Sequence, residues 1–156
     1  PGVLDTWTAT VDYGDGSGAQ PLALAGMTFN LSHIYTVAGT FTVSVAVRDK
    51  DGGVGIAQAT VAVQSLQQAV AAMQQTVQNL QSSGILNPPT ANSWQVALSK
   101  IMTSIDQGDY AGAISGLQAF IVKVQGLVDK GKMSAQDAQL LLDPANALLL
   151  RLQRLV

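Results

Sequence analysis

The chain contains no cysteine and no glutamate, and His33 is its single histidine. The absence of cysteine excludes thiol catalysis, disulfide bonds and thiolate metal sites. One histidine supplies too few of the ligands that zinc and copper prefer. No nucleophile and base are visibly paired along the sequence. We therefore expect a protein that is not an enzyme and has no cofactor.

Charge is also scarce, because charged residues make up only 12% of the chain and the formal net charge is −2. This balance gives no electrostatic reason to expect nucleic acid or an acidic membrane as a partner. A surface with few charges repels its own copies weakly, which favours association. We expect the partners to be copies of the chain itself or adjacent segments of the same parent protein.

The sequence lacks a recognisable signal peptide, and no apolar run of about 18 residues stands out, so we expect no membrane span. It begins Pro1-Gly2-Val3-Leu4, which is not a natural translation start. We therefore expect the chain to be a piece of a longer product.

The composition changes near Gln64, which favours two small cores over one large one. Residues 1–64 are rich in glycine, threonine and valine and alternate between polar and apolar positions, the pattern of half-buried strands. The clearest strand spans residues 38–49. Further strands are expected at residues 6–13, 27–32 and 54–63, with glycine-rich turns at 14–18 and 49–53.

Residues 65–156 carry apolar side chains every three or four residues, which predicts amphipathic helices. The expected helices span about 65–82, 91–107, 110–130 and 134–155. Their short connections favour an antiparallel four-helix bundle. The last helix has leucines on more than one face. It is either the central helix of its own bundle or packs one face on another subunit or on the β domain.

Four motifs of the first domain occur in an order that resembles a PKD domain over roughly residues 3–64. They are VDYGDGS at 11–17, SHIY at 32–35, AGTFTV at 38–43 and VRD at 47–49. The resemblance implies an immunoglobulin-like β-sandwich of the kind found in extracellular and surface proteins. Such domains are mostly spacers or binding modules, and many are attached to secreted hydrolases.

A PKD domain normally has one or two further strands ahead of the position of Pro1, so we expect an incomplete sandwich. Such a sheet leaves backbone groups unpaired and an apolar face uncovered. Three explanations are open. The 156 residues begin partway through a longer domain, the mature protein is cut at this point, or a neighbouring subunit donates the missing strands.

The third and fourth expected helices resemble the FIMAH-type helical domain of bacterial secreted proteins. The pair Phe120-Ile121 matches that family, whereas Val124 stands where the namesake motif has a histidine. The resemblance implies a small C-terminal module of large extracellular proteins, with no chemistry to carry over.

Asp12, Asp15, Asp49 and Asp51 lie in the two glycine-rich turns and are candidate calcium ligands, because calcium prefers carboxylate oxygens. Some PKD domains bind calcium through loop acids, although a complete EF-hand-type loop is absent here. The alternative is that all four are ordinary turn residues.

Five residues are expected to have structural roles: Trp7, His33, Tyr35, Phe41 and Phe120. We expect His33 to be buried and hydrogen-bonded, and the Tyr35 hydroxyl to anchor a loop, as in the tyrosine corner of β-sandwiches. Trp7 and Trp94 fit core positions better than an exposed platform for sugars.

The sequence thus predicts an α+β chain with two domains, an incomplete immunoglobulin-like antiparallel β-sandwich over 1–64 and an antiparallel four-helix bundle over 65–156. We interpret it as a non-enzymatic subunit of a bacterial extracellular or cell-surface assembly, a filament, surface layer or adhesin. It would associate through strand complementation and apolar helix packing. The alternatives are an accessory carbohydrate- or protein-binding or spacer region of a large secreted hydrolase or adhesin, and a linker stiffened by calcium.

Overall fold

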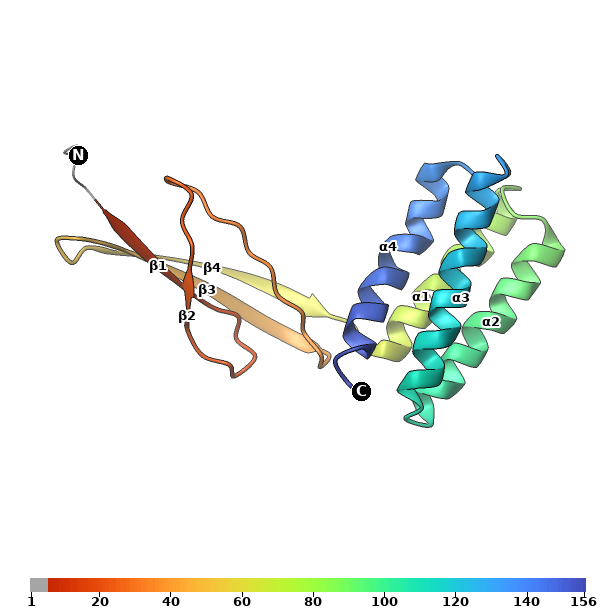
Figure 1. The fold of residues 1–156 in the computed structure, drawn as a ribbon, viewed down its shortest axis with the longest axis horizontal. Coiled ribbons are helices and arrows are strands. Elements are labelled where there is room, and N and C mark those ends of the chain that lie inside the picture. The colour runs from red at the N-terminus through yellow and green to blue at the C-terminus, as the bar shows by residue number, and fades with distance from the viewer. Residues whose placement is uncertain (1–5) are drawn as a thin grey trace. The chain divides into compact units, whose positions relative to one another are not determined.

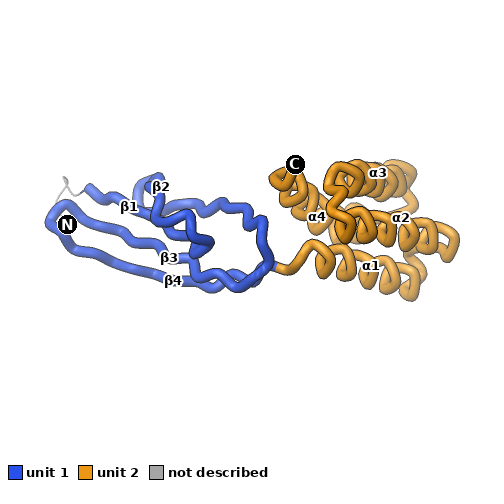
Figure 2. The backbone as a smooth tube through the Cα atoms, turned by 90° about the horizontal axis from the view of Figure 1, so that it is seen from below, with its two compact units in different colours: residues 1–63 blue, residues 64–156 orange. Residues whose placement is uncertain are grey.

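The computed structural model describes residues 6–156. The chain forms two compact units, Pro1–Val63 and Gln64–Val156 (Figure 2). The first contains an antiparallel sheet and the second contains helices (Figure 1), so the predicted α+β layout is confirmed.

The sheet has four strands in the order β2-β1-β3-β4, and each neighbouring pair is antiparallel. The strands are β1 (Trp7–Asp12), β2 (Gln20–Leu22), β3 (Gly39–Asp49) and β4 (Val54–Val63). The long β3 lies between β1 and β4, as expected for the strand with the strictest alternation.

The strand register gathers the apolar side chains on one face of the sheet. Val11 of β1 lies opposite Val45 of β3, and Val45 lies opposite Ala57 of β4. Because opposed residues of antiparallel strands point to the same side, these positions form one continuous face. The small core on this face contains Val11, Tyr13, Val43 and Val45. The segment between β2 and β3 covers this core. The described part of the unit therefore contains one sheet, whereas a β-sandwich contains two.

One expected strand is absent. Residues 27–32 were expected to form a strand but lie outside the regular sheet, and only an isolated bridge pairs Ala25 with Thr28. Gln20–Leu22, expected to be irregular, pairs with β1 instead. Alternation predicts which faces residues occupy, but a strand also needs a partner backbone. Among residues 6–156 no strand pairs with this segment.

The second unit is a bundle in which each helix contacts the next along the chain and α1 also contacts α4. The helices are α1 (Leu66–Ser82), α2 (Pro88–Asp106), α3 (Tyr110–Asp129) and α4 (Ala135–Leu152). They begin close to the expected positions, except that α2 starts three residues earlier than expected. Asn87 accepts a hydrogen bond from the Thr90 N–H at 2.9 Å, and prolines occupy the first turn, where no backbone donor is needed.

Helix α3 corrects the expectation that the sequence has no apolar run of about 18 residues. It contains an 18-residue window of mean hydropathy 1.4, so by length and composition alone it could cross a membrane. In the bundle this helix packs Leu117, Phe120 and Val124 into the core against α2 and α4. A core helix passes the same hydropathy test.

Helix α4 divides its leucines between two environments. Leu141, Leu148 and Leu152 are buried in the bundle core, whereas Leu140 and Leu150 are exposed. The helix therefore completes its own bundle, as one alternative expected. It also presents apolar side chains outward, which the other alternative, packing on another subunit or on the β domain, requires.

The bundle core predicts the effect of removing Phe120, a large aromatic side chain at its centre. Phe120 is 1% exposed and makes an edge-to-face contact with Trp94, with ring centroids 5.5 Å apart. Phe120→Ala is expected to lower the free energy of unfolding of this unit by about 3–5 kcal/mol in urea titrations, through lost burial and a cavity. Val122→Ala, at an exposed site on the same helix, is the control. Equal losses in the two variants would contradict the assigned packing.

Candidate functional site

Four aromatic rings pack in series beside the sheet core. Tyr13 stacks on His33 with centroids 4.1 Å apart, and His33 meets Tyr35 edge-on at 4.7 Å. Tyr35 in turn stacks on Phe41 at 4.3 Å. These contacts hold residues 33–35 against β1 and β3, although the segment contributes no strand.

Two tyrosine hydroxyls bond to backbone groups in the same region. The Tyr35 hydroxyl donates to the Tyr13 carbonyl oxygen at 2.9 Å, and the Tyr13 hydroxyl donates to the Ser32 carbonyl oxygen at 3.2 Å. Partial burial, together with the Asp15 charge, raises the pKa of the Tyr35 hydroxyl. The hydroxyl therefore stays protonated and continues to donate across the neutral range.

His33 is half-buried and contacts a turn carboxylate. Its Nε2 lies 2.7 Å from Oδ2 of Asp15. The other oxygen of Asp15 accepts from the Ser17 hydroxyl at 2.6 Å and from the Ser17 N–H at 3.1 Å. Hydrogen bonds from Ser17, and then from His33, lower the pKa of Asp15 to about 2. Together these bonds link residues 15–17 of the turn to His33.

The four candidate calcium ligands are divided between the two ends of the sheet. Asp12 lies opposite Ser44, whereas Asp49 lies opposite Trp7, five positions farther along β3. At about 3.4 Å per residue, this places the two turns roughly 17 Å apart. Within the described chain no three acidic or histidine side chains gather as a metal site.

Each of these carboxylates already has local donors or a local cation. Asp12 accepts from the Gly14 N–H at 2.8 Å. Asp49 accepts from the N–H groups of Asp51 and Gly53 at 2.9 and 2.7 Å. Asp51 lies 2.8 Å from the Lys50 ammonium. All of these contacts stabilise turns.

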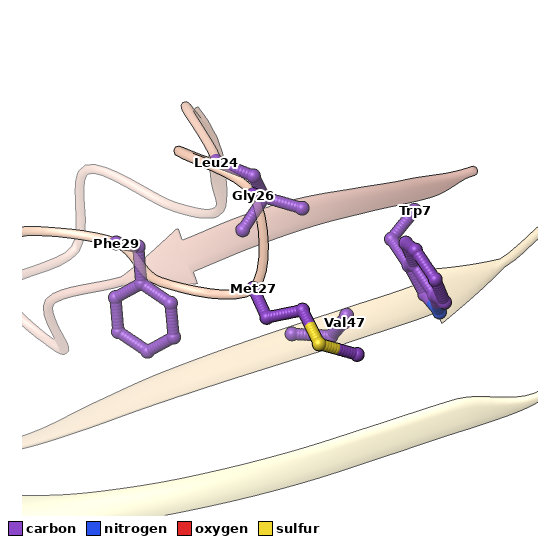
Figure 3. A pocket seen from close by; sticks show the side chains of 6 residues that line it. All are labelled: Trp7, Leu24, Gly26, Met27, Phe29 and Val47. Atoms are coloured by element: carbon purple, nitrogen blue, oxygen red, sulfur yellow. The ribbon is translucent and has the colours of Figure 1, made fainter. Parts of the chain in front are cut away.

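The apolar face of the sheet is open at the end that carries Trp7. A hollow of about 180 Å³ lies there, and Figure 3 shows Trp7, Met27 and Val47 gathered over the strands around it. Trp7 is 38% exposed and Met27 is 83% exposed. The expectation that Trp7 is a core residue is therefore wrong in its burial. Alternation placed the ring on the core face, but no described layer covers that end of the face.

The same face is open over β4. A second hollow, of about 290 Å³, has Leu31, Tyr35, Ala59 and Val61 among its lining residues. Ala57 and Ala59 of β4 are exposed, although their side chains point to the core side. We call the two hollows and the exposed Met27–Leu31 segment between them the open face. It is apolar, so it suits aliphatic side chains or rings and not metal or acid–base chemistry.

The sequence predicted an uncovered apolar face but not its position over residues 27–31, because the alternation of Met27, Phe29 and Leu31 is that of an ordinary strand. All three are exposed in the structure.

Comparison with known families agrees with both resemblances. Residues 70–150 match the family model described as the FIMAH domain, and residues 1–64 match the model described as the PKD domain. The two families and their order confirm the expectation from the sequence motifs, and the FIMAH match extends beyond the third and fourth helices to residues of all four. No curated protein is significantly similar to the chain.

The lowered pKa of Asp15 predicts how the stability of the sheet unit depends on pH. The folded pKa of about 2 lies below the ordinary value of 3.8, so the carboxylate stabilises the fold above pH 3.8. That contribution is lost as the pH falls from 3.8 towards 2. Asp15→Asn is therefore expected to lower Tm near pH 6 and to have little effect near pH 2. Asp51→Asn controls for net charge, and a pH-independent Asp15→Asn difference would argue against the assignment.

The separation of the turn carboxylates predicts a weak response to calcium. Millimolar calcium, the range that occupies extracellular calcium modules, is expected to leave the Tm of the sheet unit unchanged. The four carboxylates do not converge, and their oxygens are engaged locally. A calcium-dependent rise in Tm that is abolished by Asp49→Asn would contradict this prediction and would support the alternative that the chain is a linker stiffened by calcium.

Proposed function

The chain belongs to the FIMAH domain family and carries a PKD domain ahead of that domain, and from this premise we propose that it is a non-enzymatic structural module of a bacterial surface assembly. Both domains are typical of extracellular or surface proteins. A filament, a surface layer or an adhesin would each need such a module to associate with other polypeptide.

The open face is the observation that carries this proposal. Trp7, Met27 and Phe29 are exposed on the side of the sheet that also holds the core. A contiguous exposed apolar surface is typical of an interaction site. A β layer from outside the described residues would cover these side chains and remove them from water.

The extended segment beneath that layer offers the means of attachment. Residues 27–32 alternate like a strand, and among the described residues no regular strand pairs with them. A strand added alongside would bond to this backbone and set its own apolar side chains into the two hollows, the usual mode of strand complementation. The donor is a neighbouring subunit or an adjacent segment of the parent protein.

Apolar packing of the bundle would add to the association. Leu140 and Leu150 are exposed on α4, in a unit whose surface has few charges. Exposed leucines on a helix already packed in its own bundle can contact another subunit without disturbing the fold.

A second function is favoured by the rings at the open face. Trp7 and Phe29 border an apolar hollow, and exposed aromatic rings also pack against sugars or apolar peptide side chains (Figure 3). The chain would then be an accessory carbohydrate- or protein-binding region of a secreted hydrolase or adhesin. Binding of glycans by the monomeric chain, abolished by Trp7→Ala, would select this function over the structural one.

Tryptophan fluorescence tests the structural proposal directly. Trp94→Phe leaves Trp7 as the only indole, and its emission is expected to be that of a water-exposed ring in the dilute chain. Within the assembled parent protein the emission should move to shorter wavelength, because the added layer covers the ring. Trp7→Phe is the matched control. Its only indole is the buried Trp94, so its emission wavelength should not change on assembly. An unchanged Trp7 emission on assembly would count against coverage of the open face.

A further inference from the structure

The outer edge of β4 is long and unprotected. Strand β4 spans ten residues, of which only Val63 is not exposed. Within residues 6–156 it pairs with β3 on one side, and no strand lies on the other (Figure 2). Edge strands of soluble proteins normally carry a charge, a proline or a bulge that discourages pairing. Strand β4 has no charged residue and no proline, and its register with β3 runs without interruption.

The composition of β4 is that of a central strand. Its residues VGIAQATVAV place apolar side chains on both faces, with Ile56 on one side of the sheet and Val61 on the other. Ile56 is 68% exposed. Apolar residues on both faces are typical of strands inside a sheet that is covered on both sides.

The opposite edge of the sheet is protected. Strand β2 has only three residues, and Pro21 is the middle one. A short strand with a proline is a standard way to block edge pairing. The sheet therefore has one edge that can accept a strand, so pairing between copies closes after two chains and cannot grow into a fibre.

The hydrogen bonds of the hairpin indicate which backbone groups face outward. The Asp49 N–H donates to the Gly53 carbonyl oxygen at 3.0 Å. Ladder bonds alternate between antiparallel strands, so Ala57 and Ala59 bond to β3. The intervening residues, Ile56, Gln58 and Thr60, turn their N–H and C=O groups to the free edge.

We propose that two copies of this chain pair antiparallel through β4 and form one continuous eight-stranded sheet. A twofold axis at Ala59 places Ile56 opposite Ala62 and Gln58 opposite Thr60, and Ala57 opposite Val61. Apolar side chains then meet apolar ones on each face, and the two polar residues meet each other. This self-complementarity selects a second copy over an unrelated strand, and the absence of charge means that the two identical edges do not repel.

The dimer uses the free backbone edge of β4, whereas the proposed function depends on cover over the apolar face of the sheet. The two meet only where Ala59 and Val61 line the second hollow. Ile56 lies on the other side of the sheet and Met27 lies at the hollow beside Trp7, so variants at these two residues separate the dimer from the proposed function.

Sedimentation velocity of the 156-residue chain over a range of concentrations tests the dimer. The chain is expected to pass from monomer to dimer, and Ile56→Lys is expected to abolish the dimer without lowering Tm, because the side chain is exposed in the monomer. Val122→Lys is the matched control, since Val122 is 70% exposed on α3, and it should leave dimerisation unchanged. Met27→Lys, at the open face, should also leave it unchanged. A monomer at all concentrations, or a dimer that survives Ile56→Lys, would overturn the proposal.

Amide hydrogen exchange gives a second, independent readout. The N–H groups of Ile56, Gln58 and Thr60 should exchange quickly in dilute chain and become protected as the concentration rises. Those of Ala57 and Ala59, bonded to β3, should be protected at both concentrations. If the outward amides stay unprotected in the dimer, or are protected already in the monomer, another surface pairs and the proposal is wrong.

Discussion

The structure of the first unit depends on one constraint: an apolar sheet face needs a second layer to remove it from water. The sheet has a small core of Val11, Tyr13, Val43 and Val45, covered by the segment between β2 and β3. That segment leaves Trp7 at one end and Val61 on β4 partly exposed to water. The exposed tryptophan and the extended segment without a strand partner both follow from this shortage.

The two units satisfy the same physical requirement in different ways. The bundle encloses its own core, in which Met73, Leu117 and Leu141 are fully buried. The sheet unit relies on aromatic stacking and turn hydrogen bonds to hold its single covering segment. The Tyr35 hydroxyl and the Asp15–His33 contact do this from opposite ends of residues 33–35. The Asp15–His33 contact and the Tyr35 hydroxyl therefore keep the covering segment in place.

Much of the fold could be predicted from local patterns. Alternation gave the face of Val43 and Val45, and the spacing of apolar residues gave the four helices, because both signals are periodic and local. Burial could not be predicted in the same way. Trp7 and Met27 have core-type spacing, yet they are exposed because burial depends on a neighbouring layer. The predicted start of α2 is three residues late because the spacing of apolar residues gives no signal at Pro88 and Pro89, although proline is favoured in the first turn of a helix. The calcium ligands looked plausible in sequence, and only the strand register showed that they lie at opposite ends of the sheet.

The most direct test of the central claim is an electron cryomicroscopy map of the native assembly that contains this chain. The account predicts a β layer against Trp7, Met27 and Leu31, traced to polypeptide outside residues 6–156 and paired with the backbone of residues 27–32. A map in which that face meets only solvent, with residues 27–32 still unpaired, would contradict it.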